Sequence, residues 1–374
     1  MVNQALLEEI AEGKVSYLVP TDYNRKGPGR RTGGVFYNRQ MQFNRDVCIS
    51  FIDAVCRKGC RILDAMGATG IRSARIAVET ARDMDITCND SSTEAVELMR
   101  LNFSRLGLDE VTVSRRRAQA LLSEEHFDYI DIDPFGTPVS FIPSALLSAR
   151  NRGVIAVTAT DAAVLCGSAR GALRRYLCRP LRAPFMHEIG LRCLAGYIVR
   201  MAASYDLAAT PLLSYFADHY FRLYVRIERG TLKAERSLGM IGYAHHDPVS
   251  GERTVDRTPS SGAAGPLWIG PLHDRETLSG MHVREWFGTY VRMERQMKIW
   301  REECIAPPLH YSMDELASRL KISMPERDSL MDYLSSLFPV YRTHLDPKGI
   351  RTAATLREVE EAILKKYGGG RGAY

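Results

Sequence analysis

The stretch CRILDAMGATGIRSARIAVET, residues 60–80, decides the fold. It opens with a short apolar run typical of a buried strand, continues through two glycines, and ends with the apolar spacing of a helix. A strand that passes through a glycine-rich turn into a helix is the start of a βαβ unit. The turn then lies at the carboxyl end of the strand, where open α/β sheets bind their ligands.

Further strands alternate with helices downstream. We predict these strands in DITCND (85–90), VTVS (111–114), HFDYIDID (126–133) and GVIAVTATD (153–161). Such alternation predicts a parallel sheet that helices cover on both faces. The segment 211–230 differs, because it holds two apolar stretches, and the second alternates like a half-exposed antiparallel strand. We therefore predict a Rossmann-like, seven-stranded sheet with an antiparallel last strand, the class I S-adenosylmethionine-dependent methyltransferase fold.

Composition changes after about residue 231, so we predict two domains. Residues 1–230 would form the methyltransferase domain with a basic, loop-rich N-terminal segment, and residues 231–374 a smaller α+β domain. In the second domain we interpret 245–266 as a loop or linker and 284–300 as a helix with a core-facing stripe. The stripe consists of Trp286, Tyr290, Met293, Met297 and Trp300. Two short helices and a hairpin at 341–352 resemble a winged-helix module.

The 374-residue chain carries a net charge of +6, and its basic residues cluster. The clusters are NRKGPGRR (24–31), SRRR (114–117) and RGALRRYLCRPLR (170–182). They favour a polyanionic partner, because arginine forks bind phosphate and stack on bases. A solvated face would explain any one cluster, and a genomic base composition that favours arginine codons is the alternative for the high arginine content.

The sequence gives no sign of a metal or a membrane. Its eight cysteines form no CxxC pair, so we expect them to be reduced and mostly buried, with neither a zinc site nor a disulfide framework. We find no signal peptide and no apolar run of about 18–20 residues, so we expect a cytoplasmic protein.

The glycine-rich turn DAMGATG begins at Asp64, and Gly67 and Gly70 would let the backbone approach a ligand at a helix N-terminus. It is neither GxGxxG nor a phosphate-binding GK[ST] loop. Asp90 ends the second strand, 20 residues beyond Gly70, where an acid accepts hydrogen bonds from a ribose diol. The alternative for Asp90 is a helix cap. Together with the reversed last strand, these residues favour S-adenosylmethionine over NAD.

The fourth strand ends in DIDPFGTP, residues 131–138. Asp133 and the backbone carbonyl of Pro134 could hold the two hydrogens of an exocyclic amine, and Phe135 could stack on its ring. Methyl transfer would then depend on positioning and electrostatics rather than on a strong base. Asp131 points to the other face or supports the loop. The alternative is a simple Pro-Gly turn.

With these motifs, the chain resembles the archaeal tRNA (guanine(26)-N2)-dimethyltransferases. The resemblance covers nearly the whole chain and rests on VFYNRQMQFNRD, LDAMGATGIRSAR, NDSSTEAVELM, DIDPFGTP, VTATDAAVLCG, DHYFRLYVRI, GPLWIGPLHD and RTHLDPKGIRT. It implies transfer of one or two methyl groups from S-adenosyl-L-methionine to N2 of guanine 26 in tRNA. It also implies cofactor contacts for Arg45 and Arg72, a place for Phe36 opposite Phe135, and a place near the base for Asp161. The C-terminal domain would bind tRNA.

Two departures from the family pattern stand out. Arg117 and Ala118 occupy the place where the family commonly has an acidic residue for the adenine amino group, which leaves a backbone contact at Ala118. The two cysteine pairs of many relatives are absent, and His245 and His246 are too few to bind zinc.

Other functions stay open at this stage. The alternatives are a catalytically silent RNA-binding protein and an N-methyltransferase that acts on DNA adenine or a protein amide. The sequence does not decide the number of methyl groups, the set of tRNAs, whether a neighbouring guanine is modified, or the oligomeric state.

Overall fold

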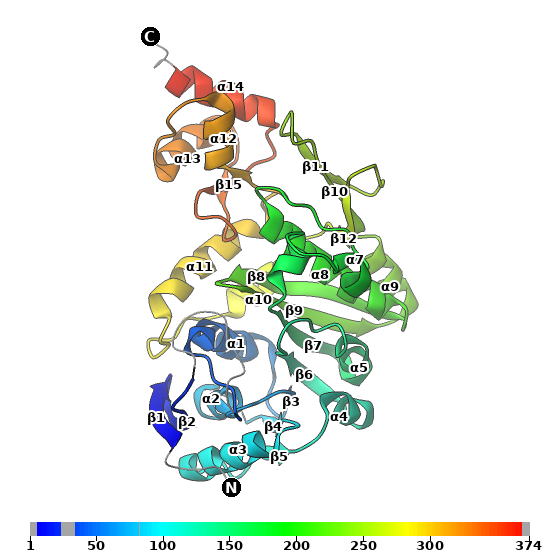
Figure 1. Ribbon diagram of the computed structural model, residues 1–374, viewed down its shortest axis with the longest axis vertical. Coiled ribbons are helices and arrows are strands. Elements are labelled where there is room, and N and C mark those ends of the chain that lie inside the picture. Colours follow the sequence, from blue (N-terminus) through cyan, green and yellow to red (C-terminus); the bar gives the residue numbers. More distant parts are fainter. Residues whose placement is uncertain (1–5, 24–33, 82, 369–374) are drawn as a thin grey trace.

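The computed structural model describes residues 6–23, 34–81 and 83–368, and its centre is a seven-stranded sheet (Figure 1). The strand order is β5-β4-β3-β6-β7-β9-β8. The strands are β3 (Arg61–Asp64), β4 (Asp85–Asn89), β5 (Thr112–Ser114), β6 (Phe127–Ile132), β7 (Ala149–Ala159), β8 (Leu207–Ala217) and β9 (Tyr220–Arg229). Strands β3 to β7 pair in parallel, and β9 pairs antiparallel with β7 and β8. The predicted methyltransferase fold is confirmed.

The prediction that the last strand is half-exposed is wrong. Strand β9 lies between β7 and β8, and residues from its two faces are buried in the two apolar cores of the domain. Arg222 and Tyr224, which alternation placed on the solvent side, are fully buried. A buried arginine requires a partner, and Arg222 finds it in Asp131 of β6. The alternation therefore separates an apolar face from a buried polar one.

Two apolar cores cover the two faces of the sheet. Helices α1 (Gln42–Val55), α2 (Ile71–Glu79) and α3 (Thr93–Leu106) contribute to one core. Helices α4 (Ala118–Glu124), α5 (Ile142–Ser148) and α8 (Met186–Ala203) contribute to the other. Successive residues of β3 alternate between them, with Ile62 in the first core and Leu63 in the second. This is the two-sided burial expected of a parallel sheet.

The N-terminal segment is more regular than predicted. Strands β1 (Leu7–Glu12) and β2 (Val15–Pro20) form an antiparallel hairpin, and β2 packs against α2 and α3. The short 3-10 helix η2 (Arg39–Met41) then leads into α1. The basic cluster 24–31 lies outside the described residues.

The predicted linker at 245–266 is wrong. This region contributes to a three-stranded sheet of β10 (Ile241–His246), β11 (Arg253–Asp256) and β12 (Ala264–Trp268), in the order β11-β10-β12. The Pro, Ser and Gly residues that suggested a linker lie mainly in the two turns between these strands. Helix α9 (Thr231–Leu238) packs on β8, and β12 packs on α8. The chain after residue 231 therefore continues against the methyltransferase sheet.

The C-terminal elements extend from that sheet (Figure 1). Helix α10 (Arg275–Gly280) precedes α11 (Tyr290–Glu303), which begins six residues later than predicted. Of the predicted stripe, Met293, Met297 and Trp300 are in the core. Beyond them lie α12 (Met313–Leu320), α13 (Arg327–Ser335) and α14 (Leu356–Tyr367), with β13 (Tyr311–Ser312), β14 (Tyr341–Arg342) and β15 (Gly349–Arg351) in the order β13-β15-β14.

The predicted hairpin at 341–352 is present as the β14–β15 pair. The winged-helix interpretation and the domain boundary at residue 231 stay predictions. Among the described residues, no helix combines the length and the apolar character needed to cross a membrane.

Candidate functional site

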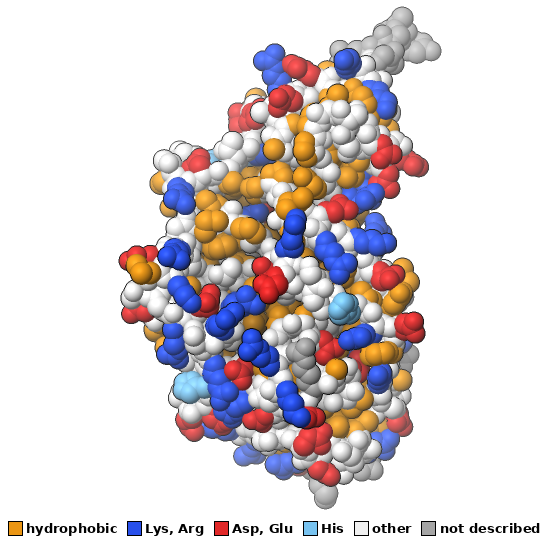
Figure 2. Space-filling view, turned by 180° about the vertical axis from the view of Figure 1, so that it is seen from behind, with side chains coloured by type: hydrophobic (Ala, Val, Ile, Leu, Met, Phe, Trp, Pro, Cys, Tyr) orange, Lys and Arg blue, Asp and Glu red, His pale blue; other side chains and the backbone are white. Residues whose placement is uncertain are grey.

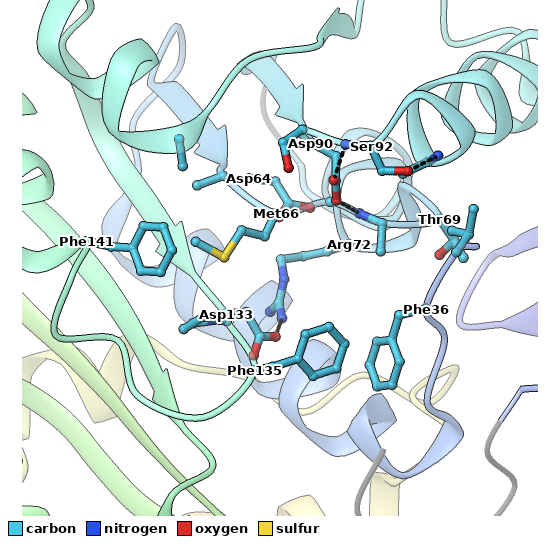
Figure 3. Close-up of a pocket in the computed structure, with 18 of the residues that line it drawn as sticks. Phe36, Asp64, Met66, Thr69, Arg72, Asp90, Ser92, Asp133, Phe135 and Phe141 are labelled. Atoms are coloured by element: carbon cyan, nitrogen blue, oxygen red, sulfur yellow. Dashed lines mark hydrogen bonds and ion pairs between the residues drawn. The ribbon is translucent and has the colours of Figure 1, made fainter. Parts of the chain in front are cut away.

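A cavity of about 1460 Å³ opens at the carboxyl ends of β3, β4 and β6 (Figure 3). All predicted site residues except Gly70 and Asp161 line it. They are Phe36, Arg45, Asp64, Gly67, Arg72, Asp90, Arg117, Ala118, Asp133, Pro134 and Phe135. The fold therefore brings together side chains that lie up to 99 positions apart in the sequence, from Phe36 to Phe135.

The glycines of the first turn have packing roles. At Gly70, φ is 81° and an added Cβ would meet Phe103 at 2.9 Å. At Gly67, an added Cβ would collide with Cys88 and Met99. Both glycines thus allow the turn to lie close to β4 and α3, and Gly67 lines the cavity through its backbone. These close contacts are with the protein interior, and a close approach of the turn to a ligand stays a prediction.

Asp90 lies at the rim of the cavity, directly after β4. Its carboxylate accepts hydrogen bonds from the backbone N–H groups of Ala68, at 3.1 Å, and Ser92, at 2.9 Å (Figure 3). These bonds tie the ends of β3 and β4 together and fix the carboxylate in place. Each oxygen keeps a free lone pair, so Asp90 can also accept from a ligand hydroxyl.

Asp64 is buried at the end of β3 and accepts a hydrogen bond from Ser73 Oγ at 3.1 Å. Burial raises the pKa of Asp64 to about 7; Arg72 opposes the rise and Asp131 adds to it. Asp64 is thus largely protonated below neutral pH, in contrast to its neighbour Asp131, whose pKa is lowered by its ion pairs.

The two aspartates of the DIDPFGTP stretch are bound to two arginines. Asp131 is buried and accepts hydrogen bonds from Arg222 Nη1 at 3.1 Å and Nη2 at 2.5 Å. Arg72 lies 3.5 Å from Asp131 and donates to Asp133 Oδ2 at 2.6 Å (Figure 3). Burial alone would raise the pKa of Asp131, but Arg222 and Arg72 hold it below its ordinary value. Asp131 therefore supports the loop through Arg72. Of the two carboxylate oxygens of Asp133, only Oδ2 takes part in this series of ion pairs.

The loop that carries Asp133 is fastened to the loop after β7. Gly136 N–H donates to Thr160 Oγ1 at 2.7 Å, and Thr160 N–H donates back to Gly136 O at 2.9 Å. Thr137 Oγ1 donates to the Tyr176 hydroxyl, which donates to Asp161 at 2.6 Å. Asp161 is thus turned toward Tyr176, and its carboxylate is not part of the cavity wall.

Phe135 lies at the mouth of the cavity with 55% of its surface exposed. Its ring contacts Phe36 edge to face, with centroids 4.7 Å apart and planes at 81° (Figure 3). The exposed ring is therefore part of an aromatic pair, as the placement of Phe36 opposite Phe135 implied.

Arg45 has a protein partner that the sequence did not predict. Its guanidinium donates to Glu12 through Nε at 2.6 Å and Nη2 at 2.7 Å. Arg75 also contacts Glu12 at 2.8 Å. Burial alone would raise the pKa of Glu12, but Arg45 and Arg75 lower it to about 2. Neither Arg45–Glu12 bond uses Arg45 Nη1.

Arg117 and Ala118 form the start of α4. Arg117 is the N-cap residue and is exposed, whereas Ala118 is buried. No acidic side chain takes the place of the missing adenine contact at these two positions.

The comparisons with known proteins agree on one family. The family model for N2,N2-dimethylguanosine tRNA methyltransferases matches residues 22–364. The chain belongs to this family. It is 35% identical to a tRNA (guanine(26)-N(2))-dimethyltransferase of Pyrococcus horikoshii, over 98% of this chain and 100% of the relative. It is 38% identical to the enzyme of that name from Methanothermobacter thermautotrophicus, over 95% of this chain and 98% of the relative.

A solved family member has the same architecture. The structure of Trm1 from Pyrococcus horikoshii in complex with S-adenosyl-L-methionine superposes with a TM-score of 0.85 at 34% identity. The match covers 95% of this chain and 99% of that one. The resemblance drawn from the sequence motifs is confirmed, and so is the methyltransferase fold.

One further polar cluster deserves comparison with a metal site. His344 Nδ1 and His273 Nε2 contact Glu303 Oε2 at 2.5 and 3.1 Å. Glu303 also accepts from Thr343 Oγ1 at 2.7 Å and Arg351 Nε at 3.2 Å. The guanidinium would repel a cation, and the outer ring nitrogens lack the partners that metal-bound histidines normally have within the described residues. The cluster is a hydrogen-bond network, and the expectation of no metal stays a prediction.

The buried ion pairs predict a stability effect. We expect Arg222→Met to lower the free energy of unfolding by about 3–5 kcal/mol, because it leaves the buried Asp131 carboxylate without its main partner. Urea denaturation of wild type and variant measures the difference. Arg226→Met, a half-buried position on the same strand, is the matched control and should cost much less. Equal losses in the free energy of unfolding for the two variants would show that the Arg222–Asp131 ion pair makes no particular contribution to stability.

The raised pKa of Asp64 predicts a pH effect. The folded state keeps this proton up to about pH 7, whereas the unfolded state loses it near pH 4. The folded state therefore binds more protons between these values, and Asp64 makes the protein less stable as pH rises. We expect Asp64→Asn to gain stability over wild type as pH rises from about 4 to 7, with a constant difference above. Thermal melts at pH 4.5 and 7.5 measure it, and a pH-independent difference would contradict it.

Proposed function

We propose that this protein transfers one or two methyl groups from S-adenosyl-L-methionine to N2 of guanine 26 in tRNA. The observation that carries the proposal is the Asp133–Pro134–Phe135 loop, which lines a cavity at the carboxyl ends of the strands. Family membership supports it, because the relatives are named for this reaction. The related Trm1 structure supports the choice of cofactor.

The cavity fits this cofactor. Its volume accommodates a nucleoside-sized ligand together with a base, and the fixed carboxylate of Asp90 is suited to the ribose diol. Ala118, at the buried start of α4, lines the cavity, and we assign it a backbone contact with the adenine. Arg45 Nη1 and Arg72 would meet the charged amino-acid end. When bound, S-adenosylmethionine supplies a methyl group on a positively charged sulfur.

Asp133 and Pro134 would hold the acceptor amine. An aryl amine is a weak nucleophile because its lone pair is delocalised into the ring. Asp133 Oδ1 and the Pro134 carbonyl can accept its two hydrogens and orient the lone pair. Arg72 engages the other carboxylate oxygen, Oδ2, and so fixes the direction of Oδ1. Positioning of this kind can lower the activation barrier of a transfer reaction by a large part. Oδ1 then accepts the proton that the methylated amine releases.

The two phenylalanines would hold the guanine ring. A base inserted between parallel rings separates their planes by about 7 Å, twice the ordinary contact distance. The two rings are in edge-to-face contact with their centroids 4.7 Å apart, so they must rotate and separate when the base enters. The base must also leave its stack in the tRNA. Contact with the base would replace the Phe36–Phe135 contact.

Basic side chains support tRNA as the partner. Arg115, Arg117, Arg174 and Arg179 are exposed, and Lys and Arg side chains spread across the middle of the face in Figure 2. Phosphate contacts by such residues give affinity that falls with salt. We assign the C-terminal domain a share in tRNA binding.

Substitution of Asp133 separates acceptor positioning from cofactor binding. We expect Asp133→Asn to lower the rate of methyl transfer by about 10²–10³-fold, because an amide nitrogen replaces one acceptor oxygen. The dissociation constant of S-adenosylmethionine, measured by calorimetry, should change little. Asp128→Asn, at the opposite end of β6 and paired with Arg150, is the control and should keep normal transfer. Wild-type turnover in Asp133→Asn would show that Asp133 does not hold the acceptor.

The reaction is tested with labelled S-adenosylmethionine, an unmodified tRNA transcript and nucleoside analysis. We expect N2-methylguanosine or N2,N2-dimethylguanosine from position 26. A matched transcript with inosine at position 26 lacks only the exocyclic amine and should remain unlabelled. Binding of tRNA and cofactor without transfer would support the silent RNA-binding alternative. Label at another nucleoside would point to a different acceptor.

A further inference from the structure

Two buried cysteines lie unusually close together in the core to which α4, α5 and α8 contribute. Cys178 Sγ and Cys193 Sγ are 2.7 Å apart, and the two residues are 0% and 1% exposed. Unbonded carbon atoms pack at about 3.5–4.0 Å, and sulfur is larger. Another buried sulfur pair in the protein, Cys88 Sγ and Met99 Sδ, keeps 3.6 Å. The Cys178–Cys193 separation lies between such a contact and a disulfide bond of about 2.05 Å.

The two cysteines lie in different elements, and the shorter one depends on contacts with its neighbours for its position. Cys178 follows the short helix α7 (Ala172–Tyr176), and Cys193 lies in the middle of the long helix α8. The segment 170–182 is one of the basic clusters. A five-residue helix has little stability of its own, so its position depends on contacts with its neighbours.

Cys178 lies between two anchoring residues of this segment. Tyr176, two positions earlier, forms hydrogen bonds with Thr137 of the loop 133–138, here called the acceptor loop, and with Asp161. Arg179, one position later, exchanges backbone hydrogen bonds of 2.9 and 2.8 Å with Gly265. A covalent link at Cys178 would therefore fix both the basic segment and the tyrosine that supports the acceptor loop.

We propose that Cys178 and Cys193 form a disulfide that fastens segment 170–182 to helix α8. The expectation that every cysteine stays reduced would then fail at this pair. In the reaction, two S–H bonds break and one S–S bond forms. The two electrons and two protons pass to a small-molecule or protein disulfide, which becomes two thiols. The modification goes beyond methyl transfer and does not depend on the proposed function.

Burial determines when the bond can form. The pKa of the Cys193 thiol is raised by burial and by its contact with Cys178, and the thiolate is the form that attacks a disulfide. Exchange is therefore slow in the folded protein and takes place while the segment is open. Once closed, the bond is shielded from small thiols.

Peptide mapping tests the proposal directly. The protein is refolded from urea with oxidised glutathione, its free thiols are alkylated, and it is digested without reduction for mass spectrometry. We expect a cross-linked peptide that joins Cys178 to Cys193. Alkylated cysteine or a glutathione adduct at both positions would overturn the proposal. Because this measurement uses the wild-type chain, it does not depend on whether a variant folds.

Thermal stability provides a second test. The link closes a loop of about 15 residues, so refolding under oxidising rather than reducing conditions should raise Tm by about 5 °C. Cys178→Ser and Cys193→Ser should each remove this difference. Cys166→Ala changes another cysteine of the same core cluster and should keep it. A Tm that does not depend on redox conditions in wild type would contradict the proposed link.

Discussion

The structure depends on a chain of alternating charges that runs from the reversed strand to the cavity. Arg222 of β9 pairs with Asp131 of β6, Asp131 lies beside Arg72 of α2, and Arg72 binds Asp133. Two guanidinium groups and two carboxylates balance, so the chain adds no net charge to the interior. Removing Asp131 would leave the fully buried Arg222 without its carboxylate partner, which is costly. The position of the acceptor loop is thereby coupled to the strand order of the sheet.

This coupling explains why the site is largely preformed. The loop is held by hydrogen bonds from Arg72 to Asp133 and by hydrogen bonds to Thr160 and Tyr176. The aspartate and the backbone carbonyl that follows it therefore have fixed directions before a substrate binds. The contact between Phe36 and Phe135 is different, because a base can enter between the rings only if they separate. Under the proposed function, the site combines a fixed Asp133 with an aromatic pair that must open.

The sequence predicted the features that depend on local pattern. The strands, the glycine turn, Asp90 and the acceptor loop follow from periodicity and from residue types at strand ends. It did not predict contacts between distant segments, such as Glu12 with Arg45. The burial of Arg222 could have been predicted, since the methyltransferase strand order places β9 inside the sheet, between β7 and β8. The linker prediction failed because Pro, Ser and Gly mark the turns between short strands as readily as they mark a linker.

The most direct measurement is a double-mutant cycle between Arg72 and Asp133. Single-turnover methyl transfer to a tRNA transcript is measured at saturating S-adenosylmethionine for Arg72→Gln, Asp133→Asn and the double variant. If Arg72 acts by positioning Asp133, the double variant is about as slow as Asp133→Asn alone, because the two residues work as a unit. If the two losses multiply, Arg72 and Asp133 act independently, and the charge chain does not position the acceptor.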